Sequence, residues 1–239
     1  MIAQDQIRQL AKKYQTTELN SRREYFQHLF LSYFYQQPES RNVYFKGGTA
    51  LKIIYQSPRF SEDLDFSTTY KDARQIEQAV LSTLFEIKKE GIEVELSEAK
   101  ETSGGYLAII NFGPRRRIVN LQIHVSLREG EKKGGIVTIV NDFIPSYIVI
   151  QLLRDQLVDE KIKALLTRKK SRDFYDFYFI LRSNLMPAAK KEILPQILNT
   201  LKDSEVNFEL ELRQFLPQSH WRVIKNFKKT LVAEIERFI

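Results

Sequence analysis

The sequence predicts an α+β fold, in which a mixed sheet with helices is followed by a helical C-terminal domain. Two observations predict it. Runs rich in β-branched and aromatic residues alternate with glycine turns in the first part of the chain, whereas the second part shows helical periodicity. We therefore expect an α+β domain over residues 1–145 and a helical domain over residues 146–239, with the boundary at Pro145.

The first part of the chain is expected to begin with one or two helices over residues 4–36, where apolar side chains recur at helical spacing. A short strand over residues 43–45 then leads into a Gly-Gly-Thr turn, and a second strand covers residues 63–66. The remaining elements follow in order: an amphipathic helix over 71–89, strands over 92–96, 106–112 and 118–127, and a segment at 136–140 that fits either a strand or a loop.

From residue 146 to the end we expect helices only, with breaks near Ser171, Pro187 and Pro217. The aromatic side chains between residues 174 and 179 fit a buried core better than a platform for stacking bases. If residues of this helical part join those of the first domain in one site, the pocket lies in a cleft between the domains, where ligands commonly bind.

Composition narrows the class of protein. The chain contains no cysteine, which excludes disulfides and thiolate metal sites, and its apolar runs are too short for a membrane span, so we expect a cytoplasmic protein. The net charge is +7, and residues 146–239 carry +5 of it, with 17 Lys and Arg against 12 Asp and Glu. This bias is in the direction expected for a C-terminal part that binds a polyanion such as RNA.

The most informative segment reads KGGTALKIIYQSPRFSEDLDFS and covers residues 46–67. Strand alternation places Asp63 and Asp65 on one face and turns Leu64 and Phe66 toward a core. Two carboxylates about 4 Å apart repel by roughly 4 kcal/mol at an effective dielectric of about 20, so a divalent cation would stabilise the pair. Mg²⁺ fits, because it prefers oxygen ligands and is usually held by one or two carboxylates plus substrate phosphates.

The glycine turn fits the other half of such a site. Main-chain amides of Gly47 and Gly48 can approach a phosphate closely, Thr49 adds a hydroxyl, and the helix that follows carries partial positive charge at its start. The alternative is an ordinary turn and a solvated pair of surface carboxylates. The combination of turn and carboxylates, thirteen residues apart, favours a nucleotide site.

A second block is basic. The segment KIKALLTRKKSR, residues 161–172, contains six basic residues and no acidic one, and it reads equally as a solvated helix face or as a partner of phosphate groups. The next helix opens with Asp173 and Asp176, which lie three residues apart on one face.

Together these motifs resemble the nucleotidyltransferase (polymerase β-like) superfamily, and within it the AbiEii/AbiGii toxin family of type IV toxin–antitoxin and abortive infection systems. The resemblance covers about residues 44–181. It rests on four blocks of the sequence: GGTAL at 47–51, RFSEDLDF at 59–66, EKIKAL at 160–165 and RDFYD at 172–176.

This resemblance implies an Mg²⁺-dependent nucleotidyltransferase toxin with a cognate antitoxin, which transfers NMP from an NTP to an acceptor. RNA, such as a tRNA 3′ end, is the acceptor that it suggests. The implied metal ligands are Asp63 and Asp65, and the implied catalytic residues add Lys161 and either Asp173 or Asp176. The implied nucleotide-binding residues are Gly47, Gly48, Thr49, Arg59, Ser61, Lys161 and Arg168.

The chain departs from the superfamily in one place. A third carboxylate often stands on a later strand, and the aligned residue here is His124. His124 fits a proton acceptor and a hydrogen-bonded strand histidine equally well, Glu129 is a possible substitute, and binding of a second metal stays open. Two other functions stay open at this point: transfer to a protein or small molecule, and a catalytically silent nucleotide-binding module.

Overall fold

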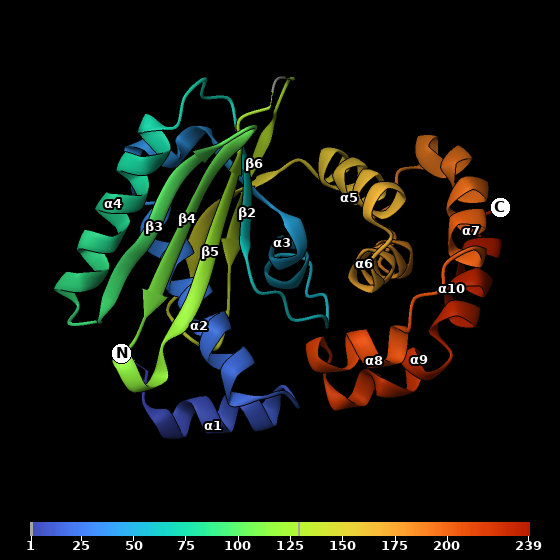
Figure 1. Cartoon of the computed structure of the whole chain (residues 1–239), viewed down its shortest axis with the longest axis horizontal. Helices are drawn as coiled ribbons and strands as arrows, with labels where there is room; N and C mark the ends of the chain where they lie inside the picture. Colours follow the sequence, from blue (N-terminus) through green and yellow to red (C-terminus); the bar gives the residue numbers. More distant parts are fainter. Residues whose placement is uncertain (1, 129) are drawn as a thin grey trace. The chain divides into compact units, whose positions relative to one another are not determined.

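The computed structural model describes residues 2–128 and 130–239. The chain forms two compact units, coloured along the sequence in Figure 1. The first consists of Met1–Gln56 and Phe60–Leu152, and the second of Ser57–Arg59 and Leu153–Ile239. The short segment Ser57–Arg59 therefore belongs with the C-terminal unit, although it lies inside the sequence of the first.

The first unit contains a mixed sheet, which confirms the predicted fold class. Its strands are β1 (Val43–Lys46), β2 (Leu64–Thr68), β3 (Val94–Thr102), β4 (Gly105–Phe112), β5 (Val119–Ser126), β6 (Gly134–Ile139) and β7 (Tyr147–Leu152). Among the described residues the order across the sheet is β3-β4-β5-β2-β1-β7-β6. The pairs β2–β5 and β1–β7 are parallel, and the other neighbours are antiparallel.

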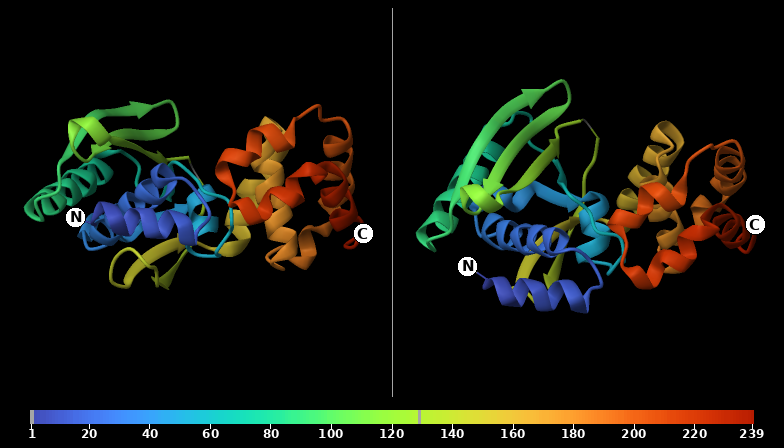
Figure 2. Two further views of the ribbon diagram at one scale, coloured as in Figure 1. Left: turned by 90° about the horizontal axis from the view of Figure 1, so that it is seen from below. Right: turned by 60° about the horizontal axis from the view of Figure 1, so that its bottom comes forward.

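Alternation along the strands builds the core. In β4 every second residue is buried, from Tyr106 to Phe112, and β5 shows the same pattern from Val119 to Val125. The helix α2 (Glu18–Phe34) packs on β5, the helix α4 (Arg74–Lys89) packs on β3, and the two helices pack on each other, as Figures 1 and 2 show.

The other helices of the first unit are α1 (Gln4–Lys13) and α3 (Gly47–Ile53). The side chain of Thr17 caps α2 by accepting a hydrogen bond from the main-chain N–H of Asn20. α2 is buried on nearly every side, including its polar residues Glu24, Gln27 and His28. Helix α3 follows β1 directly and packs on β1 and β2.

The second unit is helical. It contains α5 (Arg154–Arg168), α6 (Ser171–Arg182), α7 (Leu194–Lys202), α8 (Phe208–Leu212), α9 (Trp221–Lys225) and α10 (Phe227–Glu236). A left-handed residue, Lys169, separates α5 from α6. Phe174, Tyr175 and Phe177 are fully buried in α6, as expected of core residues. None of the helices in the described part of the chain combines the length and apolar character that a membrane-spanning segment needs.

One expectation about secondary structure is wrong. Residues 147–152 form strand β7 rather than helix, and the division between the units falls after Leu152. The sequence YIVIQL is too short and too uniformly apolar for periodicity to separate strand from helix. Its pairing with β1 and β6 decides the matter, and β6 also settles the segment at 136–140 as mainly strand.

Candidate functional site

The turn at Gly47 lies directly against Asp65. β1 ends at Lys46, whose ladder partner on β2 is Asp65, and α3 begins at the next residue. Gly47 has φ +83°, and a Cβ atom placed on it would lie 2.7 Å from Cγ of Asp65. Only glycine fits both the left-handed backbone and this close approach. The structure thus brings the glycine turn and one predicted metal ligand together.

The predicted carboxylate pair stands where β2 starts. Leu64 and Phe66 are fully buried, whereas Asp63 and Asp65 are partly exposed, as strand alternation predicts. The two acids are held differently. Asp65 lies inside β2, paired with neighbours on both sides, whereas Asp63 comes one residue before the strand begins.

His124 is the ladder partner of Asp65 on β5. Partners in a ladder point to the same face of the sheet, so the imidazole lies on the face of the carboxylate. This is the place that the sequence assigned to a third carboxylate. Whether His124 accepts a proton stays a prediction, and the substitute Glu129 lies outside the described residues.

The main chain at residues 61–63 accepts hydrogen bonds from two buried polar side chains. The hydroxyl of Thr49, fully buried in α3, donates to the carbonyl oxygen of Asp63. Gln27 of α2 donates to the carbonyl oxygens of Ser61 and Glu62, at 2.9 and 3.0 Å. Sequence reasoning missed Gln27. The available signal was a polar stripe at helical spacing, Asn20, Glu24 and Gln27, inside a helix rich in aromatic residues.

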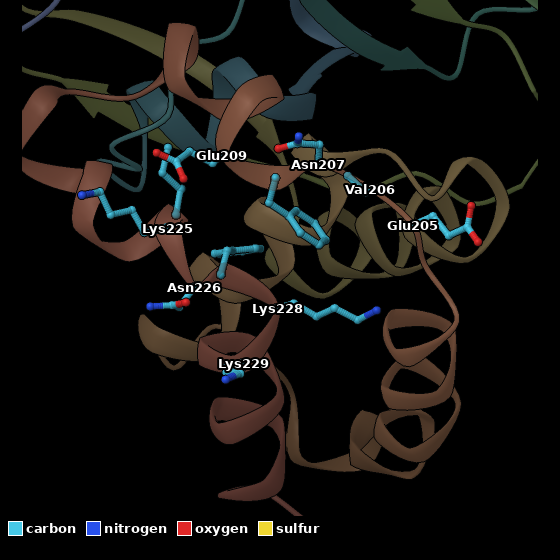
Figure 3. Close-up of a pocket in the computed structure, with 11 residues that line it drawn as sticks. Glu205, Val206, Asn207, Glu209, Lys225, Asn226, Lys228 and Lys229 are labelled. Carbon is cyan, nitrogen blue, oxygen red and sulfur yellow. The ribbon is translucent and has the colours of Figure 1, made fainter.

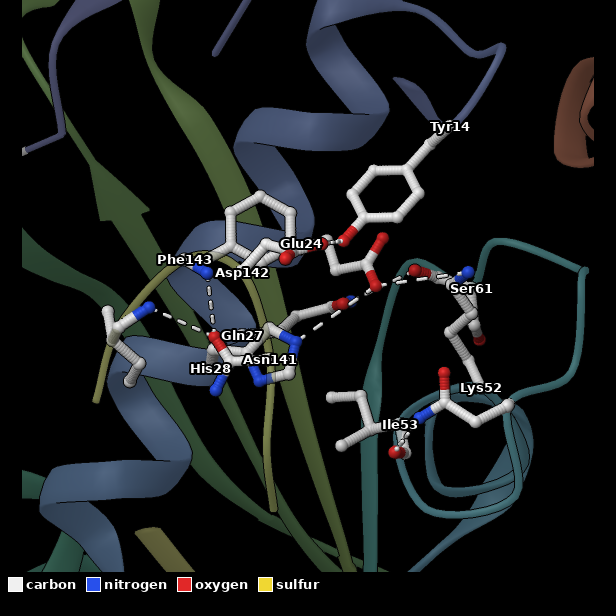
Figure 4. A network of polar contacts seen from close by, with 12 residues as sticks. Tyr14, Glu24, Gln27, His28, Lys52, Ile53, Ser61, Asn141, Asp142 and Phe143 are labelled. Atoms are coloured by element: carbon white, nitrogen blue, oxygen red, sulfur yellow. Dashed lines mark hydrogen bonds and ion pairs between the residues drawn. The ribbon is translucent and has the colours of Figure 1, made fainter. Parts of the chain in front are cut away.

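A buried network lies beside this segment and links α2, α3 and the residues after β6 (Figure 4). Nζ of Lys52 lies 3.9 Å from Oε1 of Glu24 and 4.4 Å from the ring centroid of Phe60. Burial raises the pKa of Glu24, against the lowering effect of Lys52. Burial and the charge of Lys52 lower the pKa of His28 to about 3, so its imidazole is neutral and shares a hydrogen bond with the hydroxyl of Tyr147. These contacts fix α3 against α2.

The second unit contains its own cluster of predicted site residues, centred on Asp176. Nε and Nη2 of Arg59 lie 2.6 and 2.9 Å from the two carboxylate oxygens of Asp176, and Nζ of Lys161 lies 2.7 Å from Oδ2. All three residues are buried, with 4% of Arg59, 8% of Lys161 and 1% of Asp176 exposed. This is a bidentate pair with a second cation on the same carboxylate.

Charge explains why this cluster stays ionised. Burial raises the pKa of Asp176, but the charges of Arg59 and Lys161 lower it by more, to about 2. Burial lowers the pKa of Arg59, but the charge of Asp176, its hydrogen bond and the charge of Asp173 together raise it by more, so it lies above its ordinary value. The cluster carries two positive charges and one negative charge. Asp176 is therefore arranged to hold Lys161, and its catalytic role stays a prediction.

The remaining predicted residues of the second unit have partners inside the protein. Arg168 donates to Oδ1 of the buried Asp173, and the main-chain N–H of Lys170 lies 3.3 Å from Oδ2. Asp173 thereby caps the start of α6. A nucleotide contact by Arg168 stays a prediction.

The predicted site residues thus form two clusters, one in each unit. The first contains the glycine turn, Asp63, Asp65 and His124, and the second contains Arg59, Lys161 and Asp176. That the clusters form one site stays a prediction. In the described part of the chain, no group of three or more His, Cys, Asp or Glu could hold a metal ion. The pair Asp63 and Asp65 matches the one or two carboxylates with which proteins hold Mg²⁺ when substrate phosphates complete the shell.

A cavity of about 560 Å³ lies in the second unit between α8 and α10 (Figure 3). The buried Phe208 and Phe227 line it, together with Lys225 and Glu209. None of the predicted site residues lines this cavity.

Comparisons with known proteins bear on the family and the fold of the chain. Residues 29–236 match the family model described as nucleotidyl transferase AbiEii toxin, type IV TA system. No curated protein matches the sequence. Among solved structures, MenT4, a nucleotidyltransferase toxin from Mycobacterium tuberculosis, superposes with a TM-score of 0.66 at 14% identity, covering 100% of this chain and 93% of that one.

Two structures from Helicobacter pylori are also similar in fold. A putative nucleotidyltransferase has a TM-score of 0.55 at 17% identity, covering 93% of this chain and 99% of its own. JHP933 has a TM-score of 0.52 at 15% identity, covering 93% of this chain and 95% of its own. The identities are low, so these structures support the fold, and the family match covers most of the chain. The chain belongs to the AbiEii family of nucleotidyltransferase toxins of type IV toxin–antitoxin systems.

Proposed function

We propose that this nucleotidyltransferase transfers NMP from an NTP to an RNA acceptor, such as a tRNA 3′ end, in a reaction that depends on Mg²⁺. One observation carries the proposal. The glycine turn at Gly47 lies so close to Asp65 that a Cβ atom on Gly47 would collide with the Asp65 side chain. Asp63 is two residues before Asp65 in the sequence. A phosphate-binding turn and a metal-binding carboxylate are useful at this short separation, because the substrate's phosphates are ligands of the same metal.

Asp63 and Asp65 would hold the metal. The fit rests on their chemistry as two partly exposed carboxylates, with Asp65 on β2 and Asp63 directly before it, where the apolar residues Leu64 and Phe66 are buried in the core. When bound, Mg²⁺ neutralises charge on the triphosphate and orients the α-phosphate for in-line attack.

The protein's own groups bind and orient the nucleotide. In this proposal the phosphates are bound by the main-chain amides of Gly47, Gly48 and Thr49. The hydroxyl of Thr49 is not assigned to them, because it donates to the carbonyl oxygen of Asp63. The acceptor hydroxyl oxygen forms a bond to the α-phosphorus, and the bond to the β-phosphate oxygen breaks. Pyrophosphate leaves with that electron pair, and Lys161 balances its charge.

Arg59 and Asp176 fit this scheme as residues that hold Lys161. The cluster has a surplus of one positive charge, which suits contact with an anionic leaving group. Ser61 and Arg168 remain proposed nucleotide contacts. His124 is the proposed acceptor of the proton from the attacking hydroxyl, because it lies beside Asp65 on the same face.

Surface charge supports RNA as the acceptor. The end of α5 and the turn after it expose Lys163, Lys169 and Lys170, and the C-terminal half of the chain carries most of the net positive charge. Such residues bind phosphate groups without regard to sequence. As a type IV toxin the protein has an antitoxin partner, and we place both in the cytoplasm, where NTPs and RNA occur.

The proposal is tested by incubating the protein with Mg²⁺, total cellular RNA and protein, and each α-³²P-labelled NTP in turn. We expect label in an RNA band, absent with Asp65→Asn and retained with Glu95→Gln, which removes an exposed acid from β3 of the same sheet. Label on protein or on a small molecule would contradict the RNA acceptor.

A further inference from the structure

Gln27 connects helix α2 to the residues that precede the proposed metal ligands. It is 2% exposed, and its Nε2 lies within hydrogen-bonding distance of two consecutive carbonyl oxygens, those of Ser61 and Glu62. Figure 4 shows Gln27 on α2 and the nearby chain at Ser61. An amide NH₂ has two hydrogens to donate, so one buried side chain holds both peptide groups directly before Asp63.

The two proposed metal ligands depend on different supports. Asp65 lies within β2, where pairing with β1 and β5 fixes its main chain. Asp63 precedes the first residue of β2, so its position depends on hydrogen bonds from outside the sheet. Thr49 provides one of these from α3, and Gln27 provides two from α2.

An ion pair strengthens the link to α2. Nη1 of Arg23, one helical turn before Gln27, lies 3.1 Å from Oε1 of Glu62. Two side chains of one rigid helix thus hold the same residue, Glu62, through its side chain and its carbonyl oxygen. A glutamine is required for the second contact, because glutamate would direct an acceptor at two carbonyl oxygens and an apolar side chain would leave both unpaired.

We propose that Gln27 is a positioning residue, which sets the place of Asp63 relative to Asp65 and thereby the affinity of the pair for a divalent cation. This inference rests on the proposed function, because it needs Asp63 and Asp65 to be the metal ligands. Groups that orient metal ligands affect affinity strongly, and their loss typically weakens metal binding about 10-fold to 100-fold. Gln27 acts through peptide groups rather than on a carboxylate, so we expect the lower end of this range.

The test is Mn²⁺ binding, measured by electron paramagnetic resonance with Mn²⁺ as a probe for the Mg²⁺ site. Gln27→Met keeps the length of the side chain and removes both donors, and we expect Mn²⁺ affinity to fall about 10-fold. Tyr147→Phe is the matched control. It removes a buried hydrogen bond of 2.7 Å to His28, the neighbour of Gln27 on α2, without touching residues 61–63. Its Mn²⁺ affinity should equal that of the parent.

Asp65→Asn separates failure of this inference from failure of the proposed function. Mn²⁺ binding that is lost in Asp65→Asn but unchanged in Gln27→Met would overturn the role of Gln27 and keep the metal site. A parent protein without Asp65-dependent Mn²⁺ binding would overturn the metal site and the role of Gln27 with it. Thermal unfolding checks that each variant folds, and Gln27→Asn, which keeps the amide but is one methylene shorter and so withdraws it from both carbonyl oxygens, replaces Gln27→Met if that variant does not fold.

Discussion

Replacing Arg59 with methionine should destabilise the C-terminal unit, because Asp176 would then lose its main partner. Arg59 donates two of the three short hydrogen bonds between Asp176 and cationic side chains, at 2.6 and 2.9 Å. In Arg59→Met, Lys161 alone would face the buried carboxylate.

The size of the effect follows from the burial and the geometry. A hydrogen bond to a charged group contributes about 1.5–3 kcal/mol, so two of them give about 3–6 kcal/mol. Removing one partner of a buried ion pair costs about 3–5 kcal/mol. Lys161 remains to offset part of the charge, so we expect a loss of about 4 kcal/mol. Arg59→Lys keeps the charge but not the bidentate geometry, and about half that loss is expected.

The assay is urea unfolding followed by the fluorescence of Trp221. This is the one tryptophan of the sequence, and it lies in α9, in the same unit as the cluster. The expected order of stability is parent, Arg59→Lys, Arg59→Met. A value for Arg59→Met within about 1 kcal/mol of the parent would show that the contacts of Arg59 with Asp176 contribute no more than a surface ion pair does.

Three further changes test other parts of the structure. Gly47→Ala should abolish transfer by displacing Asp65, whereas Gly91→Ala, with φ +72° but nothing near its added Cβ, should lose only about 1–2 kcal/mol of stability and keep its activity. His124→Gln should lower kcat and leave the KM for the NTP nearly unchanged, because it removes the proposed proton acceptor, and an unaltered kcat would assign the imidazole a structural role. The pKa of Asp176 is about 2 in the folded protein, against the ordinary value of 3.8 in the unfolded chain. The ionised carboxylate therefore stabilises the fold above about pH 4, and the free energy of unfolding should fall by about 2 kcal/mol as the pH is lowered to 2. Acid titration of unfolding should show this loss in the parent and not in Asp176→Asn.

Sequence patterns predicted the fold where periodicity was clear. The strands β4 and β5 and the helix α4 were placed to within about three residues, because their alternation and amphipathic spacing are strong. β7 was missed, since a segment of six residues, five of them apolar, carries no distinctive period and only pairing with β1 and β6 identifies it. The C-terminal helix expected from Pro217 is divided at Asn226, a break that depends on local backbone conformation.

For the site, the sequence identified the types of residue but not the contacts that hold them in position. Gly47 and Asp65 were linked through their chemistry, and the structure shows their contact. The ion pair between Arg59 and Asp176 spans 117 positions of the sequence, and no local pattern indicates it. The polar stripe of α2 includes Gln27, but it does not indicate the partners of this side chain, which are main-chain atoms of a distant loop that any sequence could supply.

In the proposed function, Asp65 supports transfer of the α-phosphate with its nucleoside. The most direct measurement compares α-³²P-labelled and γ-³²P-labelled NTP in parallel reactions with the parent, Asp65→Asn and Glu95→Gln. We expect the α-label to enter the acceptor and the γ-label to leave in pyrophosphate, with the parent and with Glu95→Gln but not with Asp65→Asn. Transfer of the γ-label to the acceptor, or α-transfer that persists in Asp65→Asn, would contradict the proposed function.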